Sequence, residues 1–384
     1  QAAMDALKPG ELEFVPPSFG KTYLHWLENI RDWCISRQLW WGQRIPAYYL
    51  PDGQIVVEET PEKALAAAQK INPALTAADL RQDDDVLDTW FSSWLWPISV
   101  FDPKKPGHPD HQPNKDLAYY YPTNDLVTGP DIIFFWVARM IMAGDEFMND
   151  IPFSNVYFTG IVRDKLGRKM SKTLGNSPDP LDLIAKYGAD AVRIGMLLCS
   201  SAGNDIFYDE SQVEQGRNFC NKIWNASRFL LMNLTIDQCK LPEKLELEDK
   251  WVLSKLNTLI REVTENMDAY ELGVASAKIY DFIWDTYCDW YIELAKPRLY
   301  NKENAEERAT AQHVLATVLT SAMQLLHPYM PFITEEIYCT LNPEEESIMI
   351  ASWPEWKQEW DFKQDEKDVE MIKEAVRSIR GVRT

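Results

Sequence analysis

The string GRKMSKTLGNSPDP places two lysines and two hydroxyl side chains within the five residues from Lys169 to Thr173. Ammonium and hydroxyl groups are donors that hold phosphate oxygens, and lysines also supply point charges. The flanking glycines, Gly167 and Gly175, widen the backbone conformations open to the loop, which lets it swing over a ligand. A solvated surface turn would also explain lysines near glycines. The intact KMSK tetrapeptide favours a phosphate-binding loop, in which Lys169 and Lys172 are the catalytic candidates.

The segments on either side of this loop are expected to be a strand and two helices. The β-branched and aromatic run from Val156 to Val162 predicts a buried strand that delivers the loop at its carboxyl end. Open α/β sheets bind their ligands at that end. After Pro178 and Pro180, the string LDLIAKYGADAVRIGMLL predicts one helix, a stop at Gly188 and a second helix.

Strand, basic loop and helix in this order resemble the KMSKS signature of the class I aminoacyl-tRNA synthetases, with Thr173 replacing the final serine and keeping its hydroxyl. Three further strings resemble the valyl-tRNA synthetases of that class in order and spacing: WCISRQLWWGQRIPAYY, DVLDTWFSSWLWP and TGPDIIFFWVARM. Together they extend the resemblance over nearly the whole chain. The WWG and DI strings replace the YWG and DQ strings usual in the isoleucine enzymes and favour valine, whereas Pro130 departs from the aromatic residue more common among valine enzymes.

Matching the family motifs residue by residue implies a valine-binding set and a nucleotide-binding set. Valine offers no polar handle, so its recognition depends on an apolar cavity of the right volume. The resemblance implies that Trp90, Ile132 and Trp136 line that cavity, although core packing is the ordinary role of a tryptophan. The implied nucleotide-binding set is Gly129, Asp131, Gly160, Ile161, Met170, Ser171 and Lys172.

The resemblance implies an enzyme that activates valine with ATP, accompanied by Mg²⁺, and then transfers the valyl group to tRNA(Val). Lys169 and Lys172 would neutralise the leaving phosphates, so the catalysis is positioning and electrostatics without a side-chain nucleophile. The HIGH tetrapeptide, the other phosphate signature of the family, is absent, and the chain opens on Gln1. We therefore expect an incomplete chain that is inactive alone. The parent enzyme is expected to be a monomer.

The expected fold class is α/β followed by all-α: the second half of a class I Rossmann-like nucleotide-binding domain and then an antiparallel helical bundle. Apolar stripes at helical spacing over 219–230, 252–267 and 314–325 predict the bundle. The expected parts are 1–20, the trailing edge of an editing insertion; 21–198, the carboxyl-terminal half of the catalytic domain, with a small insertion at about 51–85; 199–245, a connecting helical region that contacts the tRNA stem; 246–350, an anticodon-binding domain; and 351–384, a linker toward a carboxyl-terminal extension.

Composition indicates an intracellular protein, and we expect a cytoplasmic location. The six cysteines form no CxxC pair, which favours reduced thiols. A net charge of −20 argues against indiscriminate nucleic-acid binding, although tRNA needs only a local basic face. No metal site is expected, because His108 and His111 lie in a proline-rich string without cysteine partners. The apolar run IIFFWVARMIMA is too short to span a bilayer and contains Arg139, so it predicts a core helix and no membrane partner.

Three other functions remain open from the sequence. Activation of isoleucine is the nearest, and a measurement of the activated amino acid would separate it from valine. Nucleotidyltransferases of related fold also close basic loops over ATP, but they would not need the helical bundle. The bundle alone would suit a non-catalytic RNA-binding module, in which Arg217, Lys222 and Arg228 could face tRNA.

Overall fold

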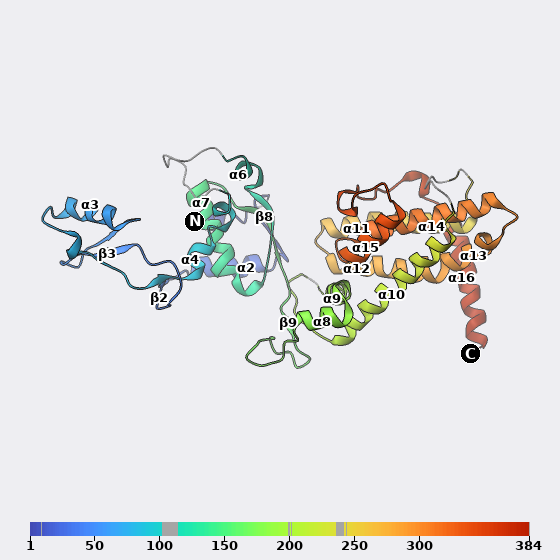
Figure 1. Cartoon of the computed structure of the whole chain (residues 1–384), viewed down its shortest axis with the longest axis horizontal. Coiled ribbons are helices and arrows are strands. Elements are labelled where there is room, and N and C mark those ends of the chain that lie inside the picture. Colours follow the sequence, from blue (N-terminus) through green and yellow to red (C-terminus); the bar gives the residue numbers. More distant parts are fainter. Residues whose placement is uncertain are drawn as a thin grey trace. The chain divides into compact units, whose positions relative to one another are not determined.

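The computed structural model describes residues 1–8, 10–101, 114–198, 200, 202–235, 242 and 244–383. His108 and His111 lie outside the described residues, so the expectation about them stays a prediction. The chain forms two compact units, Gln1–Phe158 and Thr159–Thr384 (Figure 1). They divide within the predicted catalytic segment 21–198, so the assignment of that segment to one domain also stays a prediction.

A three-stranded parallel sheet in the order β1-β8-β7 is the centre of the first unit. Thr128 of β7 pairs with Phe158 of β8, so the carboxyl ends of these two strands lie at one edge of the sheet. Parallel strands need a long crossover, and here it is helical. Its elements are η2 (Pro130–Ile132), the π-helical η3 (Ile133–Val137) and α7 (Ala138–Met148), and the strands are β1 (Glu13–Val15), β7 (Thr123–Thr128) and β8 (Phe153–Phe158).

The crossover confirms the core helix predicted from the run IIFFWVARMIMA. Ile133, Val137 and Ile141 are almost wholly buried, and they pack with α2 (Phe19–Glu28) and the sheet in one apolar cluster. Among the described residues, no helix is both long and apolar enough to cross a membrane. The other short elements of this unit are α1 (Ala2–Asp5), β2 (Ser36–Arg37), β6 (Val86–Leu87), α4 (Thr89–Ser93), α5 (Trp96–Ser99) and α6 (Lys115–Tyr120).

The small insertion predicted at about 51–85 contains a turn, short strands and an alanine-rich helix. Three antiparallel strands pair in the order β4-β3-β5 and share an apolar cluster with α3. The helix begins where Thr60 accepts a hydrogen bond from the Lys63 backbone N–H and proline takes the first helical position. Its elements are β3 (Ala47–Tyr49), β4 (Ile55–Val57), α3 (Pro61–Ile71), η1 (Ala77–Asp79) and β5 (Arg81–Gln82).

The single strand predicted from Val156 to Val162 is wrong in its bounds. The chain leaves the first sheet after Phe158, and a second short strand, β9 (Val162–Arg163), pairs in parallel with β10 (Ile206–Phe207). Between the two strands, a Cβ on Gly160 would lie 1.9 Å from the Asn204 carbonyl oxygen. The segment around Gly160 is therefore pressed against another backbone instead of continuing the ladder.

The helix pair predicted after the lysine loop is confirmed. It consists of α8 (Pro180–Tyr187) and α9 (Ala189–Leu197), and Gly188 separates them with a φ of +91°. Such a backbone angle favours glycine, which explains the stop. The long helix α10 (Glu210–Asn233) follows and contacts α9.

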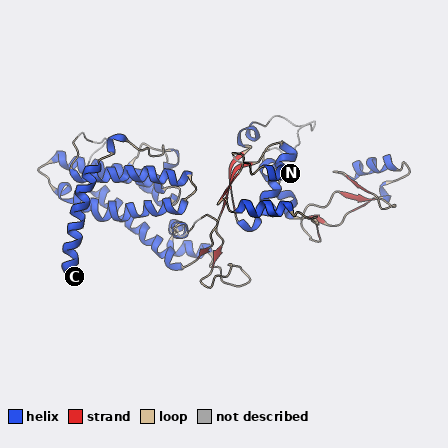
Figure 2. Cartoon of the chain, turned by 180° about the vertical axis from the view of Figure 1, so that it is seen from behind, coloured by secondary structure: helices blue, strands red, loops and turns tan. Residues whose placement is uncertain are grey.

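The remaining helices form the predicted bundle, and Figure 2 shows that helices make up most of the second unit. The expected stripes share one apolar cluster, in which Phe219, Val252 and Val314 are wholly buried. A break falls between α14 and α15, where Pro331 begins the next helix. The bundle elements are α11 (Leu247–Asp268), α12 (Leu272–Asp281), the π-helical η4 (Phe282–Tyr291), α13 (Ile292–Tyr300), α14 (Ala305–Leu326), α15 (Pro331–Leu341), η5 (Ile348–Ile350), η6 (Gln358–Trp360) and α16 (Lys363–Arg383).

A buried ion pair joins the start of α11 to the end of α13. Asp249 is wholly buried, and its two carboxylate oxygens accept hydrogen bonds from the Arg298 guanidinium at 2.6 and 2.8 Å. The Tyr291 hydroxyl donates to the same carboxylate at 2.7 Å. Glu248 lies 3.0 Å from the Arg298 Nε. Two separate helices are thereby held at a fixed position inside an apolar core.

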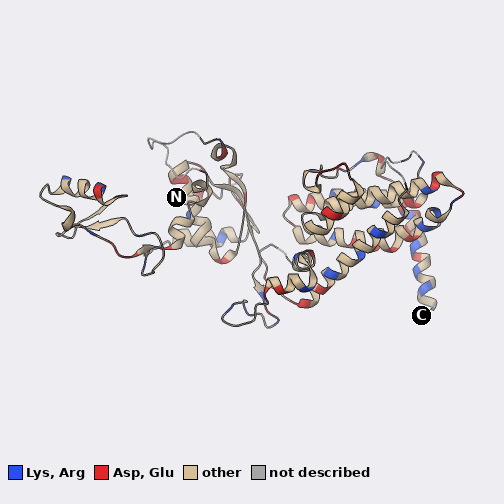
Figure 3. Cartoon of the chain, viewed as in Figure 1, with Lys and Arg blue, Asp and Glu red and all other residues tan. Residues whose placement is uncertain are grey.

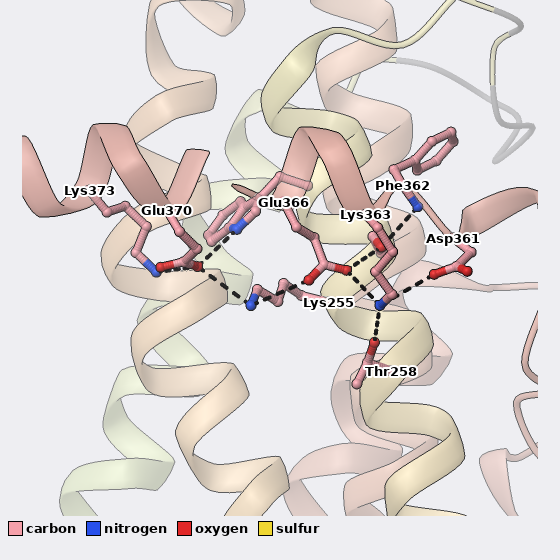
Figure 4. A network of polar contacts seen from close by, with 10 residues as sticks. Lys255, Thr258, Asp361, Phe362, Lys363, Glu366, Glu370 and Lys373 are labelled. Carbon is pink, nitrogen blue, oxygen red and sulfur yellow. Dashed lines mark hydrogen bonds and ion pairs between the residues drawn. The ribbon is translucent and has the colours of Figure 1, made fainter. Parts of the chain in front are cut away.

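Polar contacts attach α16 to α11 (Figure 4). Glu370 accepts a hydrogen bond from the Trp251 indole at 3.2 Å and lies 3.6 Å from the Lys255 ammonium. Lys255 also reaches Glu366 at 3.6 Å, and the Ser254 hydroxyl donates to that same carboxylate. Charged side chains thus contribute much of the contact between these two helices.

Candidate nucleotide-binding loop and aliphatic pocket

Two polar side chains, Asp164 and Asn176, close the base of the loop that carries Lys169 and Lys172. Asp164 accepts hydrogen bonds from two backbone N–H groups of the following turn, at 2.9 and 3.0 Å. Asn176 donates to Asp164 at 2.9 Å and accepts from the Ser171 backbone N–H at 2.9 Å. The hydrogen bond from Asn176 is the main reason that the pKa of Asp164 lies well below its usual range. Asp164 is therefore ionised at neutral pH and holds both arms of the loop together.

Two cations of this hairpin have carboxylate partners, whereas Lys172 has none among the described residues. Arg168 lies 2.7 Å from Asp164, and Lys165 lies 3.1 Å from Asp209. Lys172 is exposed, and within the described ranges no carboxylate forms an ion pair with it. An ammonium group in this position can meet the phosphate oxygens of a ligand without first losing a protein partner.

Three further residues of the predicted loop, Lys169, Met170 and Ser171, lie along the same hairpin. Lys169 forms a backbone bridge with Arg163, which returns the chain to β9, and its side chain is exposed. The Met170 N–H donates to the Val162 carbonyl at 3.3 Å. Ser171 accepts a hydrogen bond from the Leu174 N–H at 3.2 Å, so its hydroxyl oxygen helps to shape the loop. The predicted loop residues are thus gathered on one short hairpin.

Gly160 and Ile161 connect β8 to this hairpin. The close approach of Gly160 to the Asn204 carbonyl leaves no room for a side chain. Ile161 is half-buried, and its carbonyl accepts a hydrogen bond from the Ile206 N–H at 2.9 Å. The expectation that these two residues face an adenine ring stays a prediction.

The three residues predicted to bind valine line one pocket of the first unit. Trp90, Ile132 and Trp136 lie around a cavity of about 640 Å³. The Trp136 indole donates to the Ser93 carbonyl at 3.1 Å, which fixes its ring plane. A cavity of this size, walled by aromatic rings with a few polar groups, suits a small ligand with an apolar part. The remaining lining residues are Gln43, Thr89, Ser92, Ser93, Trp96 and Ser99.

Gly129 and Asp131 follow the carboxyl end of β7, immediately before Ile132 of the pocket wall. A Cβ on Gly129 would lie 2.7 Å from a carboxylate oxygen of Asp131, so glycine lets that side chain fold back over the backbone. Asp131 is exposed. The structure therefore brings Gly129 and Asp131 together with the pocket residues in the first unit, and places the lysine loop in the second unit.

Sequence reasoning missed the two residues that close the loop. Asp164 precedes Gly167 by three positions, which is a signal for a type I turn, and Gly167 adopts a φ of +78°. No comparable local signal identifies Asn176, because its partners lie five and twelve residues away. In the part of the chain that the structure covers, no group of three or more His, Cys, Asp or Glu side chains is placed to hold a metal ion.

Comparison with known proteins supports the motifs. The family model described as tRNA synthetases class I (I, L, M and V) matches residues 1–209, and the anticodon-binding domain of tRNA ligase matches residues 249–384. The valine--tRNA ligase of Clostridium acetobutylicum is 52% identical over 385 residues, covering 99% of this chain and 42% of that protein. The valine--tRNA ligase of Parabacteroides distasonis is 54% identical over 359 residues, covering 92% of this chain and 40% of that protein. The chain thus spans about two fifths of the length of these relatives.

Two solved structures show the same fold at low sequence identity. The LeuRS–tRNA–LeuAMS ternary complex from Agrobacterium radiobacter matches with a TM-score of 0.69 at 20% identity, over 89% of this chain and 45% of that chain. Methionyl-tRNA synthetase of Mycobacterium tuberculosis in complex with methionyl-adenylate matches with a TM-score of 0.61 at 21% identity, over 85% and 57%. These likenesses confirm the predicted fold class, an α/β part followed by helices. Motifs, fold and family match agree, and the chain belongs to the class I tRNA synthetases of the isoleucine, leucine, methionine and valine group.

Proposed function

We propose that this chain is the carboxyl-terminal part of the catalytic domain, with the anticodon-binding domain, of a valine--tRNA ligase. The parent enzyme activates valine with ATP and transfers the valyl group to tRNA(Val). The observation that carries the proposal is that Trp90, Ile132 and Trp136, chosen from motifs alone, line one cavity. Relatives at about 50% identity over nearly the whole chain, all valine--tRNA ligases, support the choice of amino acid.

In this proposal the pocket binds the aliphatic side chain and the lysine loop acts on the nucleotide. The valine carboxylate attacks the α-phosphate of ATP, and pyrophosphate leaves. Lys172, assisted by Lys169, neutralises the charge that develops on the leaving phosphates, which is electrostatic stabilisation of the transition state. Mg²⁺ arrives with the ATP phosphates as part of the substrate. In this proposal Gly129 and Asp131 of the first unit contribute to adenylate binding, and Gly160, Ile161, Met170 and Ser171 of the second unit contribute to nucleotide binding.

The domain assignment belongs to the same proposal. Residues 21–198 serve the catalytic domain, 199–245 connect it to the bundle, and 246–350 bind the anticodon arm. The parent acts as a cytoplasmic monomer. Because the sequence holds no HIGH string, this chain alone does not catalyse activation. Valine-dependent pyrophosphate exchange by the purified chain would contradict that point.

Substitution of Lys172 in the full-length enzyme tests the role of the loop. Lys172→Ala should slow valine-dependent pyrophosphate exchange by about 10²–10³-fold, the usual cost of losing one transition-state charge partner, and should leave the valine KM nearly unchanged. Lys165→Ala is the matched control, since Lys165 lies on the same hairpin but pairs with Asp209. An exchange rate in Lys172→Ala equal to that of the control would remove Lys172 from the mechanism.

The outer face of α10 supports the proposed tRNA partner. No acidic residue occurs between 215 and 233, although the chain has a net charge of −20. Arg217, Asn221, Trp224 and Arg228 are exposed at helical spacing on the face opposite the buried stripe, and basic residues are visible along this helix (Figure 3). Two arginines, an amide and a tryptophan on a helix stretch without acidic residues suit a phosphate backbone and unstacked bases.

Binding of tRNA gives a test of that face which is separate from valine activation. In the full-length enzyme, Arg228→Ala should weaken tRNA(Val) binding and lower the slope of log K against log salt by about one. Pyrophosphate exchange without tRNA should stay at the wild-type rate. Lys222→Ala should change tRNA binding less, because its ammonium lies 2.5 Å from Asp289. Unchanged binding and salt slope in Arg228→Ala would exclude this face as the tRNA contact.

A further inference from the structure

Arg139 of α7 is a buried cation with an unsatisfied donor. Only 6% of the residue is exposed, and within the described part of the chain its Nη1 is buried without a hydrogen-bond partner. Its guanidinium carbon lies 3.4 Å from the centroid of the Trp33 ring and 5.3 Å from that of Phe135. Burying a charge with an unpaired donor is costly, so aromatic packing alone is a poor explanation for an arginine here.

The aromatic partners of Arg139 lead to the pocket wall. Phe135, on the turn before Arg139, has its ring centroid 6.0 Å from that of Trp90, at an interplanar angle of 32°. The ring centroid of Trp33, the second aromatic partner of Arg139, lies 6.4 Å from that of Phe91, the residue after Trp90. Cation–π contact orients a guanidinium and a ring relative to each other, and tryptophan is the strongest aromatic partner. Arg139 therefore contacts Phe135, whose ring packs against that of Trp90, and Trp33, whose ring packs against that of Phe91, the residue next to Trp90 in the chain.

The backbone of Trp90 is held by a second buried charge. Asp88 is 8% exposed, and its carboxylate accepts a hydrogen bond from the Trp90 N–H at 2.8 Å. The same carboxylate lies 2.5 Å from the Arg37 guanidinium. Burial lowers the pKa of Arg139, and the nearby Asp88 charge opposes that effect. Trp90 thus has its backbone fixed by Asp88 and its ring packed against Phe135, an aromatic partner of Arg139.

We infer that Arg139 is a positioning residue for amino-acid selectivity: by packing between Trp33 and Phe135, its guanidinium sets the orientation of the Trp90 ring and hence the width of the aliphatic pocket. The inference rests on the proposed function, in which that pocket receives valine. An apolar pocket separates side chains that differ by one methylene by only about 10–200-fold, so a small displacement of one wall changes the preference measurably. The plane and the charge of the guanidinium are the properties that this role requires.

A structural role and a positioning role predict different outcomes for Arg139→Met. A buried charge replaced by an apolar side chain of similar length is often neutral or favourable for stability. We therefore expect Arg139→Met in the full-length enzyme to keep its urea midpoint and its ATP KM. The valine KM should rise by about tenfold and the preference for valine over isoleucine should fall, because a flexible thioether does not fix the Phe135 and Trp33 rings as a planar guanidinium does.

Amino-acid-dependent pyrophosphate exchange with valine and with isoleucine is the assay, and Arg139→Lys and Trp90→Ala complete the set. Arg139→Lys keeps the charge without the planar group, so its valine preference should lie between wild type and Arg139→Met. A wild-type valine KM and preference in Arg139→Met, together with a defect in Trp90→Ala, would overturn the inference and leave the proposed function standing. If Trp90→Ala also kept the wild-type values, the pocket assignment itself would fall. Should Arg139→Met not fold, an unaltered preference in Arg139→Lys would overturn the inference.

Discussion

Removal of the Asp249 carboxylate should strongly destabilise the helical bundle. In Asp249→Ala, the Arg298 guanidinium loses both hydrogen bonds of 2.6 and 2.8 Å, and the Tyr291 hydroxyl loses its acceptor. Arg298 is 9% exposed, so water does not replace the lost partner. Glu248 at 3.0 Å offers partial compensation.

The expected cost follows from leaving one member of a buried pair behind. Breaking such a pair from one side costs about 3–5 kcal/mol, and the remaining contact with Glu248 places this case near the lower end, at about 3 kcal/mol. In a domain of roughly 150–250 residues this corresponds to a fall in Tm of about 6–12 °C, at about 2–4 °C per kcal/mol. Asp249→Asn should cost less, because the amide oxygen still accepts one of the hydrogen bonds.

Urea unfolding of the purified chain, followed by circular dichroism at a helix-sensitive wavelength, measures this change. The midpoint should fall while the slope of free energy against urea stays constant, since the exposed surface on unfolding is unchanged. Lys63→Ala is the control, because Lys63 and Glu59 form an exposed pair on the insertion and its loss should leave the midpoint unaltered. A midpoint for Asp249→Ala indistinguishable from this control would refute the reasoning about the buried pair.

Three further outcomes are expected. Asn176→Ala removes the hydrogen bonds to Asp164 and Ser171, so limited proteolysis should cleave the loop between 164 and 176 faster than in wild type. Equal cleavage rates would show that other contacts close the loop. Gly160→Ala places a Cβ within 1.9 Å of a carbonyl oxygen and should lower the urea midpoint of the chain, whereas Gly381→Ala, which has nothing within 4 Å, should not. Burial lowers the pKa of His327 below its ordinary 6.5, so the folded state favours the neutral imidazole. The stability contributed by this group should therefore be complete above about pH 6.5 and should decline as the pH falls below that value. Urea midpoints measured from pH 7.5 to 5.5 should show this decline, and His327→Gln should flatten it.

Local sequence signals were sufficient for the elements that depend on short-range chemistry. The stop at Gly188 follows from the preference of glycine for a positive φ, and the helix of the insertion begins at a threonine cap followed by proline. The family, the fold class and the three pocket residues were also predicted, because the motif strings carry spatial information that periodicity alone lacks. The buried stripes of the bundle followed from helical spacing.

Features that depend on long-range contacts were missed. The strand predicted from Val156 to Val162 is interrupted because residues near Gly160 contact the segment around Asn204, and nothing in the local sequence reports that contact. The same limit applies to Asn176, whose three hydrogen-bond partners are set by the path of the whole loop. The burial of Arg139 was likewise not predictable, since an arginine in an apolar run usually extends its charged end to water.

The ion pairs between α11 and α16 in Figure 4 make the attachment of the carboxyl-terminal helix sensitive to ions. Lys255 bridges two carboxylates, Glu366 and Glu370, at 3.6 Å each, and such partly exposed pairs weaken as salt accumulates. Concentrated electrolyte should therefore loosen this helix while the apolar interior stays assembled. The strength with which α16 packs on α11 therefore depends on the ionic strength of the surrounding medium.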